Sequence, residues 1–126
     1  LVPIIEPEIN IAIADKAAAE DLLLQTITRH LEAVPADQKI MLKLTLPDTA
    51  NHYAPLVAHD SVLRVVALSG GYDRKTATQR LAQNTGVIAS FSRALTEGLS
   101  AQQNDSAFDA ALGQAVLDIY HASVAG

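Results

Sequence analysis

The sequence contains no cysteine, which excludes disulfides and thiolate metal sites. It has no apolar run near the roughly 18 residues that a membrane-spanning helix requires. The net charge of −5 is spread along the chain and leaves no basic face for nucleic acid and no polybasic patch for a membrane surface. We therefore expect neither nucleic acid nor membrane as a partner. A cysteine-free chain is compatible with the cytoplasmic location that we expect.

What is present is a chain of 126 residues of which 49% are hydrophobic, enough for one domain with a real core and too many for a disordered segment. That length is small for a complete enzyme. The chain opens on Leu1 inside a predicted strand, without an initiator methionine, signal peptide or leading polar residues. We expect it to be a piece of a longer polypeptide.

Strand patterns alternate with helix patterns along the whole chain. Strands are predicted over residues 1–5, 40–46, 62–68 and 87–91, and helices over 15–34, 48–59, 73–83, 92–98 and from 105 onward, where Phe108, Leu112, Val116 and Ile119 share one face. Four strand–helix units in 126 residues give about 31 residues per unit, which is the repeat of a (β/α)₈ (TIM) barrel. A doubly wound open sheet is the alternative α/β fold, but no Gly-x-Gly-x-x-Gly follows the first strand to support it.

The stretch of residues 39–47 reads as a buried strand, apolar on both faces, with Lys43 in its middle. An unpaired ammonium there would cost several kcal/mol of desolvation. Lys43 therefore has a partner carboxylate, or becomes a neutral nucleophile of the Schiff-base type, or extends out of the strand end to solvent. We interpret Lys16, Lys39 and Lys75 as solvated, which leaves Lys43 as the candidate amine.

Two glutamates follow the first strand. Glu6 and Glu8 are spaced by two, with Pro7 holding the chain extended between them, so both carboxylates point to one side. Like charges so close raise the pKa of one of them, which suits general acid–base catalysis. The alternative is a solvated pair at a strand end.

Two further features are suited to an anion. Ser69-Gly70-Gly71 follows the third strand and forms either an ordinary tight turn or a loop whose backbone amides approach a phosphate. Ser92-Arg93 begins the helix after the fourth strand and adds a guanidinium. Barrels often bind phosphate with the loops after their seventh and eighth strands. If these four units are the second half of a barrel, the two features occupy those two places. The four histidines, His30, His52, His59 and His121, show no metal-ligand spacing. We interpret them as surface residues and expect no metal.

Four segments, in this order and with these gaps, resemble the second half of class I fructose-bisphosphate aldolase. They are Val2-Pro3-Ile4-Ile5-Glu6-Pro7-Glu8, Met41-Leu42-Lys43, Ala67-Leu68-Ser69-Gly70-Gly71-Tyr72 and Ser90-Phe91-Ser92-Arg93-Ala94-Leu95. The bacterial branch resembles the chain further over residues 88–103. The resemblance covers essentially the whole chain and implies that residues 1–126 form the C-terminal half of a single TIM-barrel domain, with its fifth to eighth strands.

The resemblance also implies roles. Lys43 matches the lysine that forms the imine with dihydroxyacetone phosphate. Glu6 matches the glutamate that acts as acid and base during carbinolamine dehydration, and Glu8 matches the companion of that glutamate. The C1 phosphate of the ketose would be bound by Ser69, Gly70, Gly71, Ser92 and Arg93. Ser92 stands where many relatives have glycine. The implied reaction is the reversible cleavage of fructose 1,6-bisphosphate to dihydroxyacetone phosphate and glyceraldehyde 3-phosphate, without metal or cofactor.

The family has a further lysine and an aspartate in its first half, so we expect this piece to be weak or inactive alone. It would act as a homo-oligomer or in association with the missing N-terminal half. One alternative is a non-catalytic half-barrel that self-associates through its open sheet edges. Another is a different imine-forming barrel lyase, such as a transaldolase or a deoxyribose-phosphate aldolase.

Overall fold

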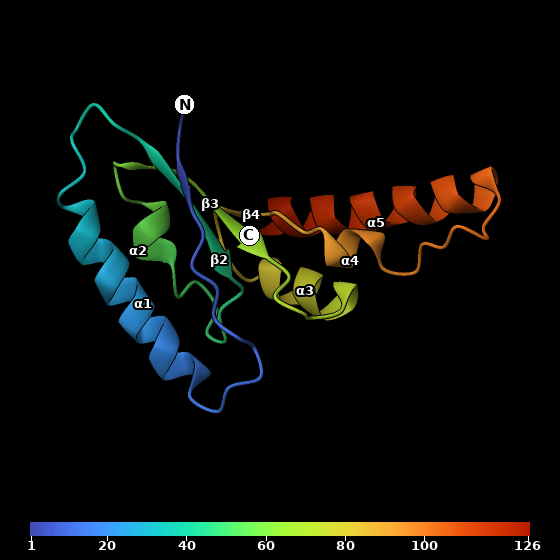
Figure 1. The fold of residues 1–126 in the computed structure, drawn as a ribbon, viewed down its shortest axis with the longest axis horizontal. Helices are drawn as coiled ribbons and strands as arrows, with labels where there is room; N and C mark the ends of the chain where they lie inside the picture. Colours follow the sequence, from blue (N-terminus) through green and yellow to red (C-terminus); the bar gives the residue numbers. More distant parts are fainter.

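The computed structural model describes residues 1–126 and has the predicted alternation of strands and helices (Figure 1). In chain order the elements are β1 (Ile4–Ile5), α1 (Lys16–Leu31), β2 (Ile40–Thr45), α2 (Ala54–Val57), β3 (Val62–Leu68), α3 (Arg74–Leu81), β4 (Val87–Ala89), α4 (Arg93–Thr96) and α5 (Asp105–Ala125). No helix combines the length and the apolar composition that crossing a membrane requires.

The four strands form one parallel sheet in the order β1-β2-β3-β4. Each strand is therefore hydrogen-bonded to the next strand along the chain. A doubly wound sheet reverses its strand order at a switch point, and this sheet has none. The α/β class is confirmed, and the sequential order is compatible with half of a barrel.

One face of the sheet carries the core. Leu42 and Leu44 of β2, and Leu46 directly after it, are fully buried on this face. All five helices contribute side chains to the same cluster. The opposite face carries Lys43 and Ile88, which are aligned through the register of β2, β3 and β4 and remain partly exposed. The helices contribute to a single core on the first face, so the Lys43 face is less completely covered: Met41 and Lys43 are half-buried there, whereas Thr45 is buried.

The start of α1 differs from the prediction in one consequential way. Lys16, expected to be solvated, is 4% exposed and is paired with the buried Glu20 one turn later. Its ammonium also donates to the Leu46 carbonyl at 3.0 Å and to Asp48 Oδ1 at 3.1 Å. The Glu20 carboxylate in turn accepts from the Asp48 amide at 3.1 Å. This network fastens the N-terminus of α1 to the chain that leaves β2.

Helix boundaries follow local chemistry with small shifts. Asp73, the first residue of the helix predicted over 73–83, caps α3, because its carboxylate accepts from the Thr76 amide at 2.7 Å. The last helix begins at Asp105, as predicted, and its N-cap is Asn104, whose side chain accepts from the Ala107 amide at 2.8 Å. The helix predicted over 48–59 shortens to the four residues of α2. After α3, the buried Asn84 side chain accepts from the Asn51 amide at 3.0 Å.

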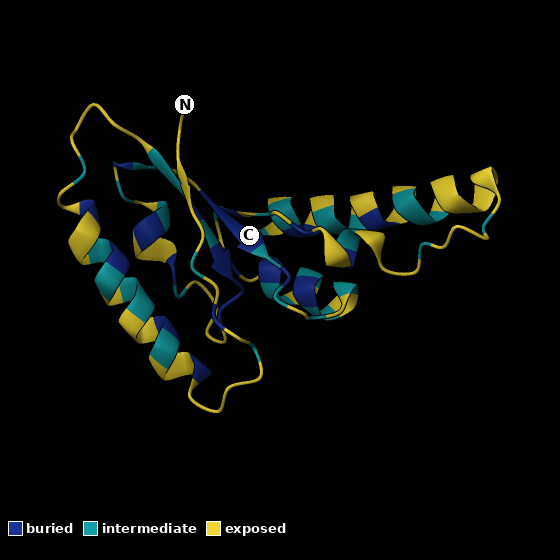
Figure 2. Ribbon diagram, viewed as in Figure 1, coloured by how far each residue is buried: buried dark blue, intermediate teal, exposed yellow.

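Helix α5 reaches well beyond the sheet, and its first turns lie in solvent (Figures 1 and 2). Its buried residues are Ala115 and Ala122, not the larger side chains of the predicted stripe; Val116 is 49% exposed. The small alanines let α5 approach the sheet closely, where the Ser123 hydroxyl accepts from the Ala89 amide at 3.1 Å.

Candidate active site

A polar cleft of about 200 Å³ opens where the four strands end. It is lined by Glu6, Glu8, Lys43, Leu68, Ser69, Gly70, Ser90, Ser92 and Arg93. Parallel strands place their carboxyl ends on one edge, and this edge is where α/β proteins carry their ligands. Every residue predicted for the site except Gly71 lies in this lining.

Lys43 and Glu6 form the centre of the cleft. Lys43 Nζ donates to Glu6 Oε2 at 2.9 Å, and the two side chains are 28% and 50% exposed. The register of β1 on β2 pairs Ile5 with Leu42, so the next residues along the two chains, Glu6 and Lys43, are neighbours. Of the three possibilities for Lys43, the structure has the partner carboxylate. An exposed pair adds little stability, but 2.9 Å is within reach of direct proton transfer.

Glu8 also lines the cleft and is exposed, so the expectation that both carboxylates face one region is met. Unlike Glu6, Glu8 takes part in no ion pair. The two carboxylates therefore differ: one touches the amine and the other is free for a ligand or a water.

The loop after β3 combines a turn with an exposed backbone. The Ser69 carbonyl accepts from the Tyr72 amide at 3.0 Å, so the tight-turn interpretation holds. Gly70 and Gly71 have φ of +65° and +101°, values that side chains rarely adopt. A Cβ on Gly70 would lie 3.1 Å from both the Ile11 and Thr45 side chains. Glycine thus lets this backbone pack tightly while it forms part of the cleft wall.

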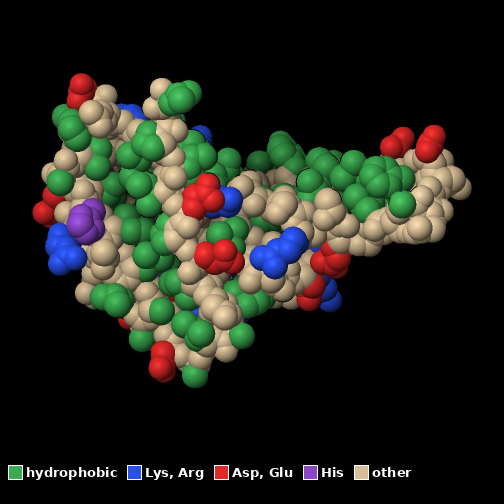
Figure 3. Space-filling view, viewed as in Figure 1, with side chains coloured by type: hydrophobic (Ala, Val, Ile, Leu, Met, Phe, Trp, Pro, Cys, Tyr) green, Lys and Arg blue, Asp and Glu red, His purple; other side chains and the backbone are tan.

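Ser92 and Arg93 enter the cleft from the other side. Both are exposed, Ser92 occupies the N-cap position of α4 without a side-chain cap bond, and Arg93 takes part in no ion pair. Helix α4 has only four residues, so its dipole is small and the guanidinium is the main positive charge here. Figure 3 shows acidic and basic side chains gathered in the middle of this face, with apolar side chains on both sides.

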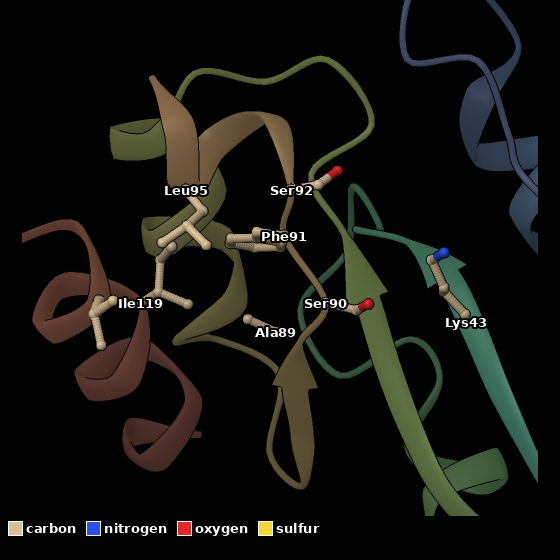
Figure 4. Close-up of a pocket in the computed structure, with 8 residues that line it drawn as sticks. Lys43, Ala89, Ser90, Phe91, Ser92, Leu95 and Ile119 are labelled. Atoms are coloured by element: carbon tan, nitrogen blue, oxygen red, sulfur yellow. The ribbon is translucent and has the colours of Figure 1, made fainter. Parts of the chain in front are cut away.

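Ser90 is a site residue that the sequence analysis missed. It lines the polar cleft and also a second pocket of about 390 Å³, formed by Lys43, Ala89, Ser90, Phe91, Ser92, Leu95, Val116 and Ile119. Its amide donates to the Ala67 carbonyl at 2.7 Å, which extends the ladder of β4 by one residue. Figure 4 shows Ser90 and Ser92 between the Lys43 strand and the apolar group that contains Phe91. The signal was available: Ser90 and Ser92 alternate after a strand and so share one side.

An amine in contact with a carboxylate, flanked by a second carboxylate, hydroxyls and an arginine, is the kind of arrangement that imine-forming lyases with phosphorylated substrates use. A comparison with known proteins bears on this arrangement. The chain is 56% identical over 124 residues to a protein of Synechocystis sp. named fructose-bisphosphate aldolase class 1. Proteins of the same name from Clostridium acetobutylicum and Porphyromonas gingivalis are each 48% identical to it over 124 residues.

These alignments cover 98% of this chain but only 41–42% of each relative, so the chain spans about two fifths of the length of these proteins. No family model matches the chain. The resemblance found in the motifs is confirmed: the chain is homologous to a segment of class I fructose-bisphosphate aldolase.

Proposed function

We propose that this chain supplies the imine-forming lysine of a class I fructose-bisphosphate aldolase, a carbon–carbon lyase of glycolysis. In the polypeptide that contains it, the enzyme would cleave fructose 1,6-bisphosphate reversibly to dihydroxyacetone phosphate and glyceraldehyde 3-phosphate. The observation that carries the proposal is the 2.9 Å contact between Lys43 and Glu6 at the ends of adjacent parallel strands. The relatives' names, at 48–56% identity, favour this substrate over those of other barrel lyases.

The proposed chemistry assigns a role to each member of the pair. Lys43 Nζ attacks the ketone carbon of the substrate, and the carbinolamine that forms loses water to give a protonated imine on Lys43. Glu6, in contact with this nitrogen, accepts the proton that the amine sheds and donates one to the departing hydroxyl. The imine then accepts the electron pair of the C3–C4 bond as it breaks. A carboxylate of the cleft takes the proton of the C4 hydroxyl, so the C4 fragment leaves as the aldehyde. The same carboxylate returns the proton to C3 of the enamine, and water adds to the resulting imine and releases dihydroxyacetone phosphate from Lys43.

Glu8 and the cleft wall would complete the site. Glu8 has no cation of its own and lies in the same cleft, so it is free to exchange protons with substrate hydroxyls or water. The C1 phosphate would bind to Ser69, Gly70, Gly71, Ser92 and Arg93, with Ser90 as an additional donor. Arg93 is exposed and unpaired, which leaves its guanidinium free for a bidentate contact with phosphate oxygens. Holding the phosphate places the ketone over the amine.

We further propose that residues 1–126 are the C-terminal half of a single TIM-barrel domain. The sequential parallel order, the single layer of helices and the two-fifths coverage of the relatives support this architecture. The open edge at β1 exposes Ile4 and Ile5, which would pair with a strand of the N-terminal half. A cytoplasmic location goes with the proposal.

The same exposed edge supports a second candidate, a non-catalytic half-barrel that pairs with its own copies. Ile4 and Ile5 on β1 and Ile88 on β4 expose apolar surface at both ends of the sheet. In that case the cleft forms at the strand ends but lacks groups needed to activate Lys43. The two candidates make different predictions for a single chemical trapping experiment.

That experiment is borohydride reduction with dihydroxyacetone phosphate, followed by intact and peptide mass spectrometry of the natural polypeptide that contains this chain. We expect one stable adduct per chain on Lys43 and none in Lys43→Arg, which keeps the positive charge beside Glu6. An adduct on another lysine, or none on folded wild-type protein, overturns the imine assignment. Trapping in the 126-residue chain alone distinguishes a functional cleft from the non-catalytic half-barrel.

A further inference from the structure

Thr45 connects the loops of the cleft from a buried position. It lies two residues after Lys43 on β2, on the same side of the strand, and is 1% exposed. Its hydroxyl accepts from the Ile9 amide at 2.9 Å and donates to the Ile9 carbonyl at 3.1 Å. One side chain therefore satisfies both backbone groups of a residue in the loop that carries Glu6 and Glu8. Strand β1 ends at Ile5, so this bidentate contact replaces the ladder that is missing beyond it.

The methyl group of Thr45 faces a different loop. A Cβ built on Gly70 would lie 3.1 Å from Thr45 Cγ2, so the glycine backbone packs directly on that methyl. Gly70 belongs to the loop after β3, whose Ser69 and Gly70 line the cleft. Thr45 thus contacts the loop that carries Glu6 and Glu8 through its hydroxyl oxygen, and the loop that carries Gly70 through its methyl group. Lys43 lies on the same strand as Thr45.

The Glu6–Lys43 contact adds little to holding the loop that carries Glu6 and Glu8, because its groups are 50% and 28% exposed and solvent weakens such pairs. The Thr45–Ile9 contacts are buried, and buried hydrogen bonds cost free energy when they are broken. A side-chain anchor three residues after Glu6 therefore restricts where its carboxylate can stand.

We propose that Thr45 is a positioning residue with two separable roles: its hydroxyl sets the Glu6–Glu8 loop against Lys43, and its methyl supports the phosphate-binding loop. This inference rests on the proposed function, because it assigns the two loops to imine chemistry and to phosphate binding. Thr45 itself touches no reacting atom. Removal of the hydroxyl group and removal of the methyl group of Thr45 should therefore cause different kinetic defects.

Thr45→Val keeps the shape and the methyl but removes both hydrogen bonds to Ile9. We expect kcat and the single-turnover rate of imine formation to fall about 10- to 100-fold, the range for a catalytic group displaced by about an ångström, with little change in KM. Thr45→Ser keeps both hydrogen bonds but removes the methyl beneath Gly70. We expect it to raise KM for fructose 1,6-bisphosphate several-fold while kcat stays near that of wild type.

If Thr45 served only the stability of the fold, its variants would have fewer working active sites, but they would not divide into one with a lower kcat and one with a higher KM. Active sites are therefore counted by borohydride adduct stoichiometry, and rates are expressed per trapped site. Thr28→Val serves as the matched control, because it removes a threonine hydrogen bond, to the Leu24 carbonyl at 2.8 Å, within α1. We expect its kcat and KM to equal those of wild type. If Thr45→Val does not fold, Thr45→Cys replaces it, since a thiol is a weak donor and acceptor and should give a graded loss.

The wild-type protein separates the possible failures. If the wild type is active, two results would overturn the positioning role and leave the proposed function standing. One is a Thr45→Val variant that keeps the wild-type rate of imine formation per site. The other is a fall in kcat together with a rise in KM in both Thr45 variants. A folded wild type that neither cleaves the substrate nor traps on Lys43 overturns both. All measurements use the natural polypeptide that contains this chain.

Discussion

Lys43 Nζ and Glu6 Oε2 lie 2.9 Å apart on two adjacent parallel strands, and the register of those strands is what brings them together. Glu8, two residues further on, shares the cleft but not the contact. Two carboxylates that look equivalent in the sequence thus occupy different positions with respect to the amine. Their substitution should have different effects.

Glu6→Gln should reduce the rate of imine formation more than Glu8→Gln does. Glutamine keeps the size of Glu6 and a hydrogen-bond acceptor but cannot take up a proton, and a positioned acid–base group contributes about 10²- to 10⁴-fold. We expect a loss in that range for Glu6→Gln and a smaller one for Glu8→Gln. The measurement is single-turnover borohydride trapping of both variants with dihydroxyacetone phosphate at several pH values. Equal losses would show that contact with Lys43 does not determine the role.

Gly70 and Gly98 provide a matched pair of positions for testing the proposed phosphate-binding loop after β3. Both have positive φ, +65° and +82°, so alanine strains the backbone at either position by about 1–2 kcal/mol. A Cβ at Gly70 would also press on Ile11 and Thr45 at 3.1 Å, whereas nothing lies within 4 Å of one at Gly98.

Gly70→Ala should therefore raise KM for fructose 1,6-bisphosphate, the proposed substrate, at least several-fold, and Gly98→Ala should lower stability with KM unchanged. Steady-state kinetics and urea unfolding of the two variants test this difference. A rise in KM of the same size in both variants would mean that backbone strain alone, and not the packing beneath Gly70, governs substrate binding.

Local signals in the sequence were sufficient for much of the fold. Strand β3 spans the predicted residues 62–68, and the capping role of Asp73 follows from its place before the helix. The site residues could be grouped because parallel strands bring their carboxyl ends to one edge. These features depend on neighbours in the chain or on a general rule of the α/β architecture, so no knowledge of side-chain packing was required.

What the sequence did not show are the contacts between distant segments. Lys16 reads as a surface lysine because its burial depends on Leu46 and Asp48, about 30 residues away. Helix α5 reads as a stripe of large apolar residues, but close packing on the sheet selects Ala115 and Ala122. Periodicity shows that a helix has an apolar face, yet several faces of an alanine-rich helix satisfy it.

The buried network at Lys16 predicts an asymmetric loss of stability. Lys16→Met leaves the Glu20 carboxylate, 1% exposed, without a cation and should cost about 3–5 kcal/mol of the free energy of unfolding. Glu20→Gln should cost less, because Lys16 keeps Asp48 and the Leu46 carbonyl as partners. In the double variant Lys16→Met/Glu20→Gln the two losses of stability should not add. With Glu20 replaced by glutamine, the loss of Lys16 no longer leaves a buried carboxylate without a cation.

Urea unfolding of the two single variants and the double variant gives the coupling directly. Lys75→Met is the control; Lys75 is exposed and takes part in no ion pair, so its loss should stay within about 0.5 kcal/mol. Additive losses in the cycle would contradict a direct interaction between Lys16 and Glu20.

Asp48 predicts how stability depends on pH. Burial alone would raise its pKa, but the hydrogen bonds and positive charges of Lys16 and Arg80 outweigh that effect and hold the pKa below its usual value. The folded state therefore favours the ionised carboxylate. Its stabilising contribution is complete above the unfolded-state pKa, about 3.9, and is lost as the pH falls through the lower folded-state value.

Asp48→Asn removes this titration. We expect the variant to be less stable than wild type at neutral pH, and the difference to shrink as the pH is lowered below about 4, because wild type then loses the same charge. Urea unfolding between pH 2.5 and 7 measures the difference. Asp37→Asn is the control, since Asp37 is exposed and outside every ion pair. A deficit of Asp48→Asn that stays constant down to the lowest pH would show that the carboxylate stabilises the fold through shape and hydrogen bonding, not through its charge.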